Sequence, residues 1–231
     1  VYAWRNLPET RDPKTAEAHP TSRPVWRAAW EVVQHPERPV SRFMLIYGVG
    51  MLAFSSMTSI LSLYLEREFG VTEQTIGYYF LYLGTLSLVI RSLLLGRIIE
   101  RIGEAGAMRV GTIALMMGLF LFPSTRNPWV LAAIIPLVPI GTALLFPATT
   151  SLMSRVTDRR ELGLTMGVAQ TFAGIARVAA PLMATTAFQR FGSGSPFLVA
   201  GGIVALVSIL AFQVQAPMIP HPTPVPNGGR Q

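Results

Sequence analysis

The sequence predicts an all-α membrane protein built from six transmembrane helices. Hydrophobic residues make up 51% of its 231 residues and charged residues only 13%, whereas soluble domains carry about 25% charged residues. Long apolar segments alternate with short polar ones, and most basic residues gather on one side of the membrane that these segments would cross. The six segments run over residues 43–65, 76–95, 107–123, 129–153, 163–188 and 196–214.

The length of each segment decides whether it can cross a bilayer. A helix rises 1.5 Å per residue, so about 20 residues span a hydrocarbon core of about 30 Å. The first segment, Phe43–Leu65, has 23 residues and no charge, which argues against the buried helices of a soluble domain. The second, fourth, fifth and sixth segments also reach the required length. The third, residues 107–123, is short and needs a flanking turn.

The distribution of lysine and arginine predicts the orientation of the helices. Fourteen of these residues fall in residues 1–42, in the loops after the second and fourth segments and in the tail, against three on the opposite side, Arg67, Arg126 and Arg190. Because cytoplasmic loops carry the excess of Lys and Arg, we expect both ends of this chain in the cytoplasm, beneath the plasma (inner) membrane. This pattern explains the net charge of +7 without nucleic acid as a partner.

Enzyme chemistry has little support in the sequence. There is no cysteine, and His19, His35 and His221 lie in polar, proline-rich stretches, so neither a metal cluster nor a histidine-based catalytic pair is indicated. No phosphate-binding loop or metal-ligand spacing appears. We therefore expect no catalytic residues, no metal and no cofactor.

Three regions are expected along the chain. Residues 1–42 form a cytoplasmic linker, residues 43–214 form the six-helix transmembrane bundle, and residues 215–231 form a disordered, proline-rich cytoplasmic tail. The opening stretch VYAWRNLPETR is typical of the last turn of a preceding membrane helix followed by its polar exit. The chain is therefore expected to be a fragment.

Within the linker, TSRPVWRAAWEVVQ predicts a short amphipathic helix, with Ser22 as its cap and Pro24 in its first turn. Arg27 and Glu31 are spaced to pair on one side of it. Its apolar face carries Trp26, Trp30 and Val33. Two interpretations stay open, a helix lying at the membrane interface and a site for a protein partner, and the first is favoured.

An internal repeat relates the two halves of the bundle. An offset of 86 residues aligns Phe43 with Trp129, Gly77 with Gly163, Arg91 with Arg177 and Ala107 with Ser193. Each copy holds three helices, an odd number, so the second copy must be inverted in the membrane. Inverted three-helix repeats are typical of secondary transporters.

One face of the fifth segment combines small and polar residues. At spacings of three and four residues, which keep side chains on one helix face, it carries Gly163, Gly167, Gln170, Gly174, Arg177 and Pro181. The small residues predict close helix packing, and Gln170 and Arg177 are expected to face away from lipid. In the second segment Gly77, Gly84 and Arg91 recur every seven residues in the same manner.

The two intramembrane arginines are the main candidates for function. A charge at the bilayer centre costs at least about 2.5 kcal/mol and usually marks a pathway or binding site. Arg177 lies near the middle of its segment and is interpreted as functional. Arg91 lies about 6 Å from the cytoplasmic end, so it has a structural alternative, snorkelling. Every Asp and Glu lies outside the six segments. The counter-charge must come from an anionic ligand, backbone carbonyls or helices outside this chain, and the last is favoured.

Further polar and helix-breaking residues leave alternatives open. Ser55 and Ser59 in the first segment either line a polar cavity or bond back to their own helix. Pro136, Pro139 and Pro147 in the fourth segment either kink a gating helix or bend a packing helix.

Two stretches carry a family resemblance. The loop GRIIERIGEAG is similar to the cytoplasmic motif Gly-x-x-x-Asp-Arg-x-Gly of the major facilitator superfamily, although Glu100 stands where Asp is usual and Glu104 and Ala105 replace the usual basic pair. The stretch PATTSLMSRVTDRRELGLTMGVAQTFAGIARVAAPL resembles helices ten and eleven of the drug–proton antiporter branch, which includes tetracycline efflux proteins. The loop residues assigned to the motif are Gly96, Arg97, Glu100, Arg101 and Gly103.

The stretch LPETR resembles the exit from helix six of such a transporter, so residues 1–214 resemble its C-terminal six-helix half. This resemblance implies a twelve-helix fold with a central cavity, alternating access and a loop motif that acts as a cytoplasmic charge lock. The partners implied are a small-molecule substrate, protons, the lipid bilayer and a missing N-terminal six-helix half, encoded upstream or by a second chain.

The expected function is transmembrane transport by alternating access, as proton-coupled efflux of drug-like or metabolite compounds. The first alternative is uptake of an anionic metabolite that Arg177 binds. The second is a non-transporting membrane adaptor or a truncated product.

Overall fold

A computed structural model of the chain describes residues 24–213, which form helices joined by short turns. The expected Ser22 cap, the stretch before it and the tail 215–231 lie outside the described residues. The elements in chain order are α3 (Val25–Gln34), α4 (Pro39–Phe69), α5 (Ile76–Val89), η1 (Ile90–Leu94), α6 (Leu95–Leu121), η2 (Phe122–Ser124), α7 (Pro128–Ile134), α8 (Leu137–Val156), α9 (Leu162–Phe191) and α10 (Ser195–Gln213).

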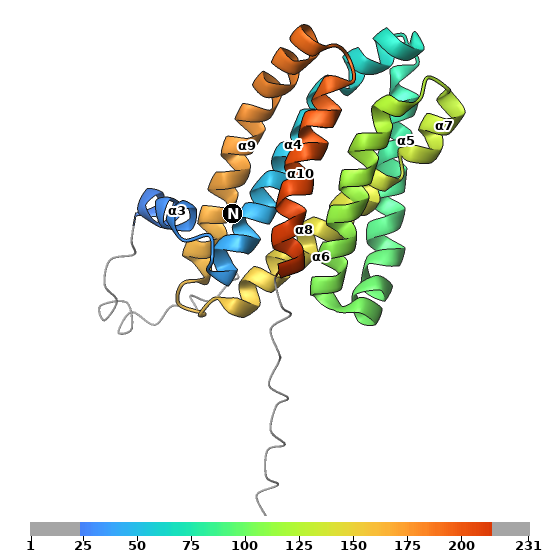
Figure 1. The fold of residues 1–231 in the computed structure, drawn as a ribbon. Coiled ribbons are helices and arrows are strands. Elements are labelled where there is room, and N and C mark those ends of the chain that lie inside the picture. The colour runs from blue at the N-terminus through green and yellow to red at the C-terminus, as the bar shows by residue number, and fades with distance from the viewer. Residues whose placement is uncertain (1–23, 214–231) are drawn as a thin grey trace, which may run out of the picture.

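Five helical segments of the described part are long and apolar enough to cross a membrane. One of them, Ile76–Ser124, has 49 residues and contains the second and third predicted spans, because the chain reverses inside α6. Figure 1 shows that α4, the later part of α6 and α9 run in one direction, and that α5, α8 and α10 run in the other. The predicted all-α fold with six transmembrane helices is confirmed.

The reversal inside α6 takes place at one glycine. Gly103 has φ 71° and ψ 172°, a conformation that residues with a Cβ rarely adopt. The helix resumes directly after it, so the third span begins before residue 107 and includes the extra turn that its short apolar segment needs.

The contacts between helices repeat as the 86-residue offset predicts. α6 packs against α8 and, equivalently, α10 packs against α4, while α9 packs against α4 and α5 packs against α8. Each contact maps onto its equivalent when the two sets of three helices are exchanged. The equivalent helices point in opposite directions (Figure 1), so the repeat is inverted. The α5–α8 contact is much smaller than the equivalent α4–α9 contact, and α5 has no buried residue.

α6 and α8 cross with their backbones in contact. A Cβ added to Gly141 would lie 2.6 Å from the backbone nitrogen of Leu115, and one added to Gly111 would lie 2.6 Å from that of Leu145. Real Cβ atoms do not approach so closely, so the crossing requires glycine at both positions. Sequence reasoning overlooked this pair, although the seven-residue spacing of Gly111 and Gly118 was an available signal.

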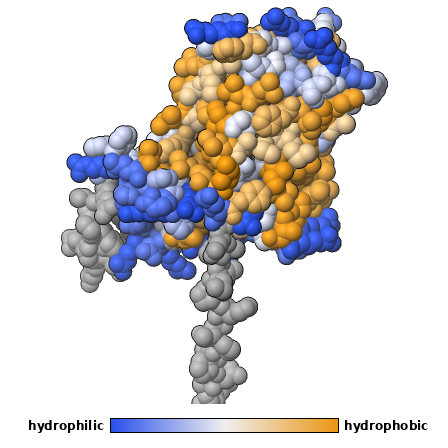
Figure 2. Space-filling model, in the orientation of Figure 1, coloured by the Kyte–Doolittle hydropathy of each residue, from blue (hydrophilic) through white to orange (hydrophobic). Residues whose placement is uncertain are grey.

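The surface has an apolar band between two polar ends (Figure 2). We call the end that holds the α5–α6 turn and the α8–α9 loop the arginine-rich end, and the opposite end the arginine-poor end. At the arginine-poor end, Glu68 accepts a hydrogen bond from Ser193 and lies 3.6 Å from Nε of Arg126. Tyr64 donates to the Phe122 carbonyl at 3.0 Å. These contacts join the end of α4 to the α6–α7 and α9–α10 connections.

Candidate functional site

The surface of α9 is divided into strips along its axis. An alanine strip is buried where α9 packs, mainly against α4. A second strip, which includes Ile175 and Leu182, is apolar and exposed. We call the predicted line of small and polar residues the open strip, because all of them are exposed or half-buried. The alanine strip consists of Ala169, Ala173, Ala176, Ala180, Ala184 and Ala187, and the open strip of Gly163, Gly167, Gln170, Gly174, Arg177 and Pro181.

The glycines of the open strip have free space in front of them. A Cβ added to Gly163, Gly167 or Gly174 would have no other group within 4 Å. The alanines, and not these glycines, make the close contacts of α9 within the described bundle. Close packing at the glycines stays a prediction for a helix from outside the described residues.

Arg177 lies on the open strip near the middle of α9, with its side chain exposed. Among residues 24–213 its guanidinium group makes no hydrogen bond or ion pair. Pro181, four residues later, has no N–H, so the Arg177 carbonyl loses its usual helical donor. One residue thus presents charged donors and an acceptor at mid-membrane depth, where lipid can satisfy neither.

Gln170 connects the open strip to the interior of the bundle. Its Nε2 donates a hydrogen bond to the hydroxyl of Tyr47 in α4 at 3.2 Å. Tyr47 is buried and packs edge-on against Phe146 of α8, with ring centroids 5.5 Å apart. The orientation of Gln170 is therefore held by a residue that contacts two helices.

Arg91 lies on a π-helical turn, Ile90–Leu94, that sequence reasoning missed. Such turns insert one residue into a helix and are frequent at functional sites. Ile90 is buried and Arg91 is exposed, and the described chain offers its guanidinium no side-chain partner. Arg91 and Arg177 are equivalent in the repeat, and their helices lie at opposite edges of the bundle (Figure 1).

The serines of α4 differ in their environments. Ser59 donates to the Ser55 carbonyl at 2.7 Å, which is the back-bonding alternative. Ser59 is exposed and Ser55 half-buried, so a role in lining a cavity stays a prediction. Ser56 is fully buried, and its hydroxyl has no partner among the described residues.

The loop motif lies at the arginine-rich end, around the turn at Gly103. Arg97 donates to the Leu93 carbonyl at 3.2 Å, a contact within its own helix. A charge lock formed by this motif stays a prediction. All five of its members, Gly96, Arg97, Glu100, Arg101 and Gly103, are exposed.

Glu104, a departure from the family motif, has defined partners on α8. It accepts a hydrogen bond from the Ser151 hydroxyl at 2.6 Å and one from Nη2 of Arg155 at 2.7 Å. Its side chain is only 14% exposed. This contact fastens the turn after Gly103 to the end of α8, and the 47 to 51 residues that separate the partners hid it from sequence reasoning.

We expect Glu104 and Arg155 to be energetically coupled. Glu104→Arg and Arg155→Glu should each lower the melting temperature in detergent, and the double exchange should recover about 0.5–1 kcal/mol, the range for partly exposed ion pairs. Arg159→Glu, in the neighbouring loop, is the control and should not rescue Glu104→Arg. Equal effects of the two rescue attempts would show that the pair contributes nothing specific.

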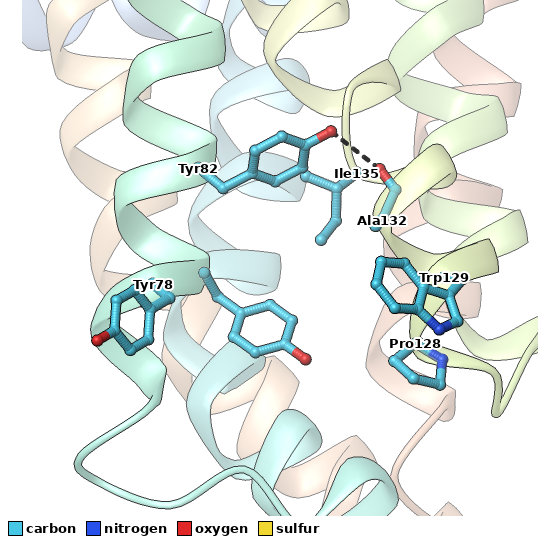
Figure 3. A pocket seen from close by; sticks show the side chains of 7 residues that line it. Tyr78, Tyr82, Pro128, Trp129, Ala132 and Ile135 are labelled. Atoms are coloured by element: carbon cyan, nitrogen blue, oxygen red, sulfur yellow. Dashed lines mark hydrogen bonds between the residues drawn. The ribbon is translucent and has the colours of Figure 1, made fainter.

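A pocket of about 340 Å³ opens between α5 and α7 near the arginine-poor end (Figure 3). Four aromatic side chains, Tyr78, Tyr79, Tyr82 and Trp129, line it together with apolar residues of α7 and its end, and none of the lining residues is charged. Such a lining suits a flat apolar or aromatic group.

Tyr82 also braces the break between α7 and α8. Pro136 has no N–H to bond the Ala132 carbonyl four residues earlier. The Tyr82 hydroxyl donates to that carbonyl instead, at 3.1 Å (Figure 3). The helix breaks at Ile135 and Pro136, so the two interpretations left open for the prolines, a gating kink and a packing bend, concern this position. Tyr82 holds the short α7 against α5.

We expect Tyr82→Phe to destabilise the protein by about 0.6 kcal/mol, the average for hydrogen bonds measured between membrane helices. Pro136→Ala restores an N–H to the helix, so in that background Tyr82→Phe should cost nothing. Tyr78→Phe is the matched control, because Tyr78 is exposed and its hydroxyl makes no hydrogen bond within the described chain. Thermal unfolding measures all four variants, and an equal cost in both backgrounds would contradict the bracing role.

The family model of the Major Facilitator Superfamily matches residues 43–231, which is most of the chain. The chain belongs to this superfamily. It is therefore a multi-pass membrane protein of a transporter family, and not of an enzyme family. Among residues 24–213, no group of three His, Asp or Glu is placed to hold a metal.

Two similar proteins add detail. The chain is 23% identical over 176 residues to the multidrug resistance protein MdtG of Dickeya zeae (strain Ech586), and the match covers 75% of this chain and 43% of that protein. The crystal structure of the human organic anion transporter MFSD10 (TETRAN) matches with a TM-score of 0.68 and 23% identity, over 74% of this chain and 40% of that one. The second likeness shows the fold alone. The chain spans less than half the length of either protein.

Proposed function

We propose that this superfamily member forms the C-terminal half of a transporter that exports drug-like or metabolite compounds in exchange for protons. The observation that carries the proposal is the open strip of α9, where Arg177 stands exposed at mid-membrane depth without a partner among residues 24–213. A charge in this position marks a pathway or an interface rather than a lipid-facing surface. The similarity to a multidrug resistance protein supports efflux.

A second six-helix half is the proposed partner of this chain. It would cover the two edges formed by α5 and α9, which are the edges that carry Arg91 and Arg177 (Figure 1). A helix of that half would approach the glycines of the open strip closely in one state of the alternating-access cycle and would leave them open to water in the other. By the positive-inside pattern, the arginine-rich end of both halves would face the cytoplasm.

Proton coupling follows if that half places a carboxylate opposite Arg177. The guanidinium favours the charged carboxylate and so keeps the pKa of that group low. Proton uptake by the carboxylate would remove the ion pair and free Arg177 as the two halves rock. The substrate and the carboxylate would then compete for Arg177. Protonation of the carboxylate and the rocking of the two halves would both break the ion pair.

A second candidate function is uptake of an anionic metabolite. Arg177 has no acidic partner among the described residues, so a substrate carboxylate or phosphate would satisfy it directly. The human protein with the similar fold is an organic anion transporter, which agrees with this alternative.

Transport by the complete gene product separates these functions. Inside-out membrane vesicles are given a proton gradient and aromatic probes of similar size, phenyltrimethylammonium and benzenesulfonate. Efflux activity predicts gradient-driven accumulation of the cation that a protonophore abolishes. Movement of the anion alone would favour anionic substrates, and movement of neither probe, nor of any compound in a wider panel, would favour the non-transporting adaptor.

A further inference from the structure

α3 presents three different faces to its surroundings. Ala28, Ala29 and Val32 are half-buried or buried and pack onto the core, where α3 contacts α9 and α4. About a third of a turn away, Trp26, Trp30 and Val33 are 67%, 60% and 52% exposed. The remaining face is polar and carries Arg27, Glu31 and Gln34. Nothing among residues 24–213 covers the tryptophan face.

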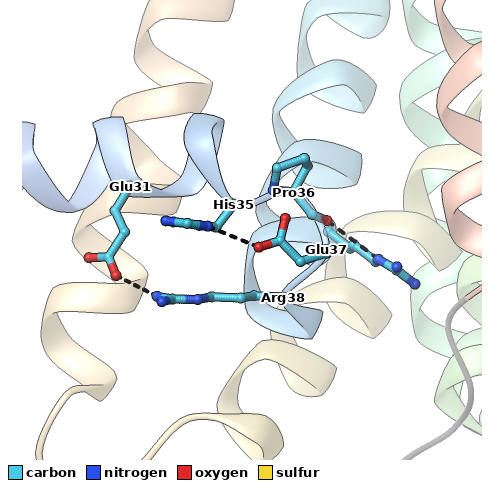
Figure 4. A network of polar contacts seen from close by, with 6 residues as sticks. Glu31, His35, Pro36, Glu37 and Arg38 are labelled. Carbon is cyan, nitrogen blue, oxygen red and sulfur yellow. Dashed lines mark hydrogen bonds and ion pairs between the residues drawn. The ribbon is translucent and has the colours of Figure 1, made fainter.

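The turn after α3 holds this helix in a fixed position (Figure 4). Glu31 forms an ion pair with Arg38, and Nδ1 of His35 lies 2.9 Å from Oε1 of Glu37. Nε of Arg42 donates to the Pro36 carbonyl at 3.4 Å. The pKa of Glu37 is lowered, first by a backbone hydrogen bond and then by His35, so this carboxylate stays charged at neutral pH.

The location of α3 restricts what can cover its tryptophans. Four residues, His35–Arg38, separate α3 from α4, and four residues reach at most about 14 Å. Because α4 crosses the membrane from this end, α3 lies within reach of the membrane surface. Tryptophan is enriched at that surface, where its ring is apolar and its N–H is hydrated.

The charges of α3 fit the same location. The guanidinium of Arg27 lies over the ring of Trp26, 5.2 Å from its centroid, at the border between the tryptophan face and the polar face. A cation in that position can reach the lipid phosphates while the ring enters the apolar layer. The network on the polar side stays in water.

We propose that α3 lies in the interfacial layer of the bilayer at the arginine-rich end, with Trp26, Trp30 and Val33 among the lipid chains and Arg27 among the phosphates. The occupant of the tryptophan face is lipid and not a protein. Because α3 packs against α9, it thereby anchors the helix that carries the open strip to the membrane surface. This inference depends on the membrane topology and not on the substrate.

The chain has no cysteine, so single cysteines can be introduced and spin-labelled without a background. The chain is reconstituted in vesicles of phosphatidylcholine and phosphatidylglycerol, and collisions of each label with oxygen and with a water-soluble nickel chelate are measured. The test positions are Trp26→Cys, Trp30→Cys and Val33→Cys, with Gln34→Cys as the polar-face control and Ala28→Cys as the packing-face control.

The proposal predicts an oxygen-to-nickel collision ratio several-fold higher at 26, 30 and 33 than at 34, as for side chains about 5–10 Å below the headgroup boundary. The label at 28 should be shielded from both reagents. Nickel access at 26, 30 and 33 equal to that at 34 would place the tryptophan face in water. Shielding of these three positions from both reagents would show a covering protein, and either result overturns the proposal.

A second measurement avoids changing the tryptophan face. With Trp4 and Trp129 replaced by phenylalanine, the remaining fluorescence comes from Trp26 and Trp30. Phosphatidylcholine brominated near the headgroup end of its chains should quench this fluorescence strongly. The same lipid brominated only near the far end of its chains should quench it much less. Absence of quenching by either lipid would contradict the proposal.

Discussion

Arg177→Ala is expected to lower transport by the complete protein about ten- to a hundredfold, with its amount in the membrane unchanged. A hydrogen bond to a charged group contributes about 1.5–3 kcal/mol, and each 1.36 kcal/mol corresponds to about tenfold in rate. Arg177 is exposed and makes no hydrogen bond or ion pair within the described bundle, so its removal should act on transport and not on folding. Initial rates in inside-out vesicles, normalised to protein amount, measure the effect.

Two further variants make this result specific. Arg177→Lys keeps the charge but loses the planar fork of donors, so it should retain an intermediate rate. Arg190→Ala is the matched control, because Arg190 is exposed in the last turn of the same helix, and it should transport normally. Unchanged transport by both Arg177 variants would remove this residue from the mechanism.

Gly141→Ala is expected to cause the largest loss of stability. The new Cβ would lie 2.6 Å from the backbone nitrogen of Leu115 and 2.9 Å from the Gly111 oxygen, and backbone atoms cannot rotate out of the way. Overpacking costs about 1–3 kcal/mol, and each kcal/mol lowers the melting temperature by about 2–4 °C in a chain of this size. The melting temperature in detergent should therefore fall by about 2–12 °C, and Gly141→Leu should abolish folded protein.

Gly202→Ala provides the matched control for this prediction. Gly202 is also a glycine within a helix, but a Cβ there would have no other group within 4 Å. Alanine favours a helix over glycine by up to about 1 kcal/mol, so the melting temperature should stay equal or rise. A comparable loss at Gly141 and Gly202 would show that helix propensity or detergent, and not the α6–α8 crossing, controls stability.

The membrane-spanning helices could be predicted closely because the bilayer sets their length. Each predicted segment is helical in the structure, although the fourth is divided into α7 and α8. The short third segment gains its missing turn directly after Gly103. The family motif predicts a turn there, and its glycine has the positive φ that the turn requires. Pro136 likewise marks the position where the fourth span breaks, because a proline removes a helical hydrogen bond.

The packing of α9 could not be predicted from periodicity alone. The glycine line and the alanine line of this helix have the same spacing and similarly small side chains. Both are suited to close packing, and only the position of α4 selects the alanines. Local sequence also contains no signal for the π-helical turn at Arg91. It contains none for contacts such as Glu104 with Arg155 either, because the partners of such contacts lie far apart in the chain.

The most direct test asks whether the open strip of α9 faces a water-filled passage. Gly174→Cys lies on the open strip and Leu182→Cys on the neighbouring apolar strip, each in the complete protein without other cysteines. The account predicts that a water-soluble maleimide modifies the cysteine at 174 and that transported substrate slows this reaction, whereas only a lipid-soluble maleimide modifies the cysteine at 182. Modification of the cysteine at 174 by the lipid-soluble reagent alone would place the open strip, and Arg177 with it, against lipid and contradict the account.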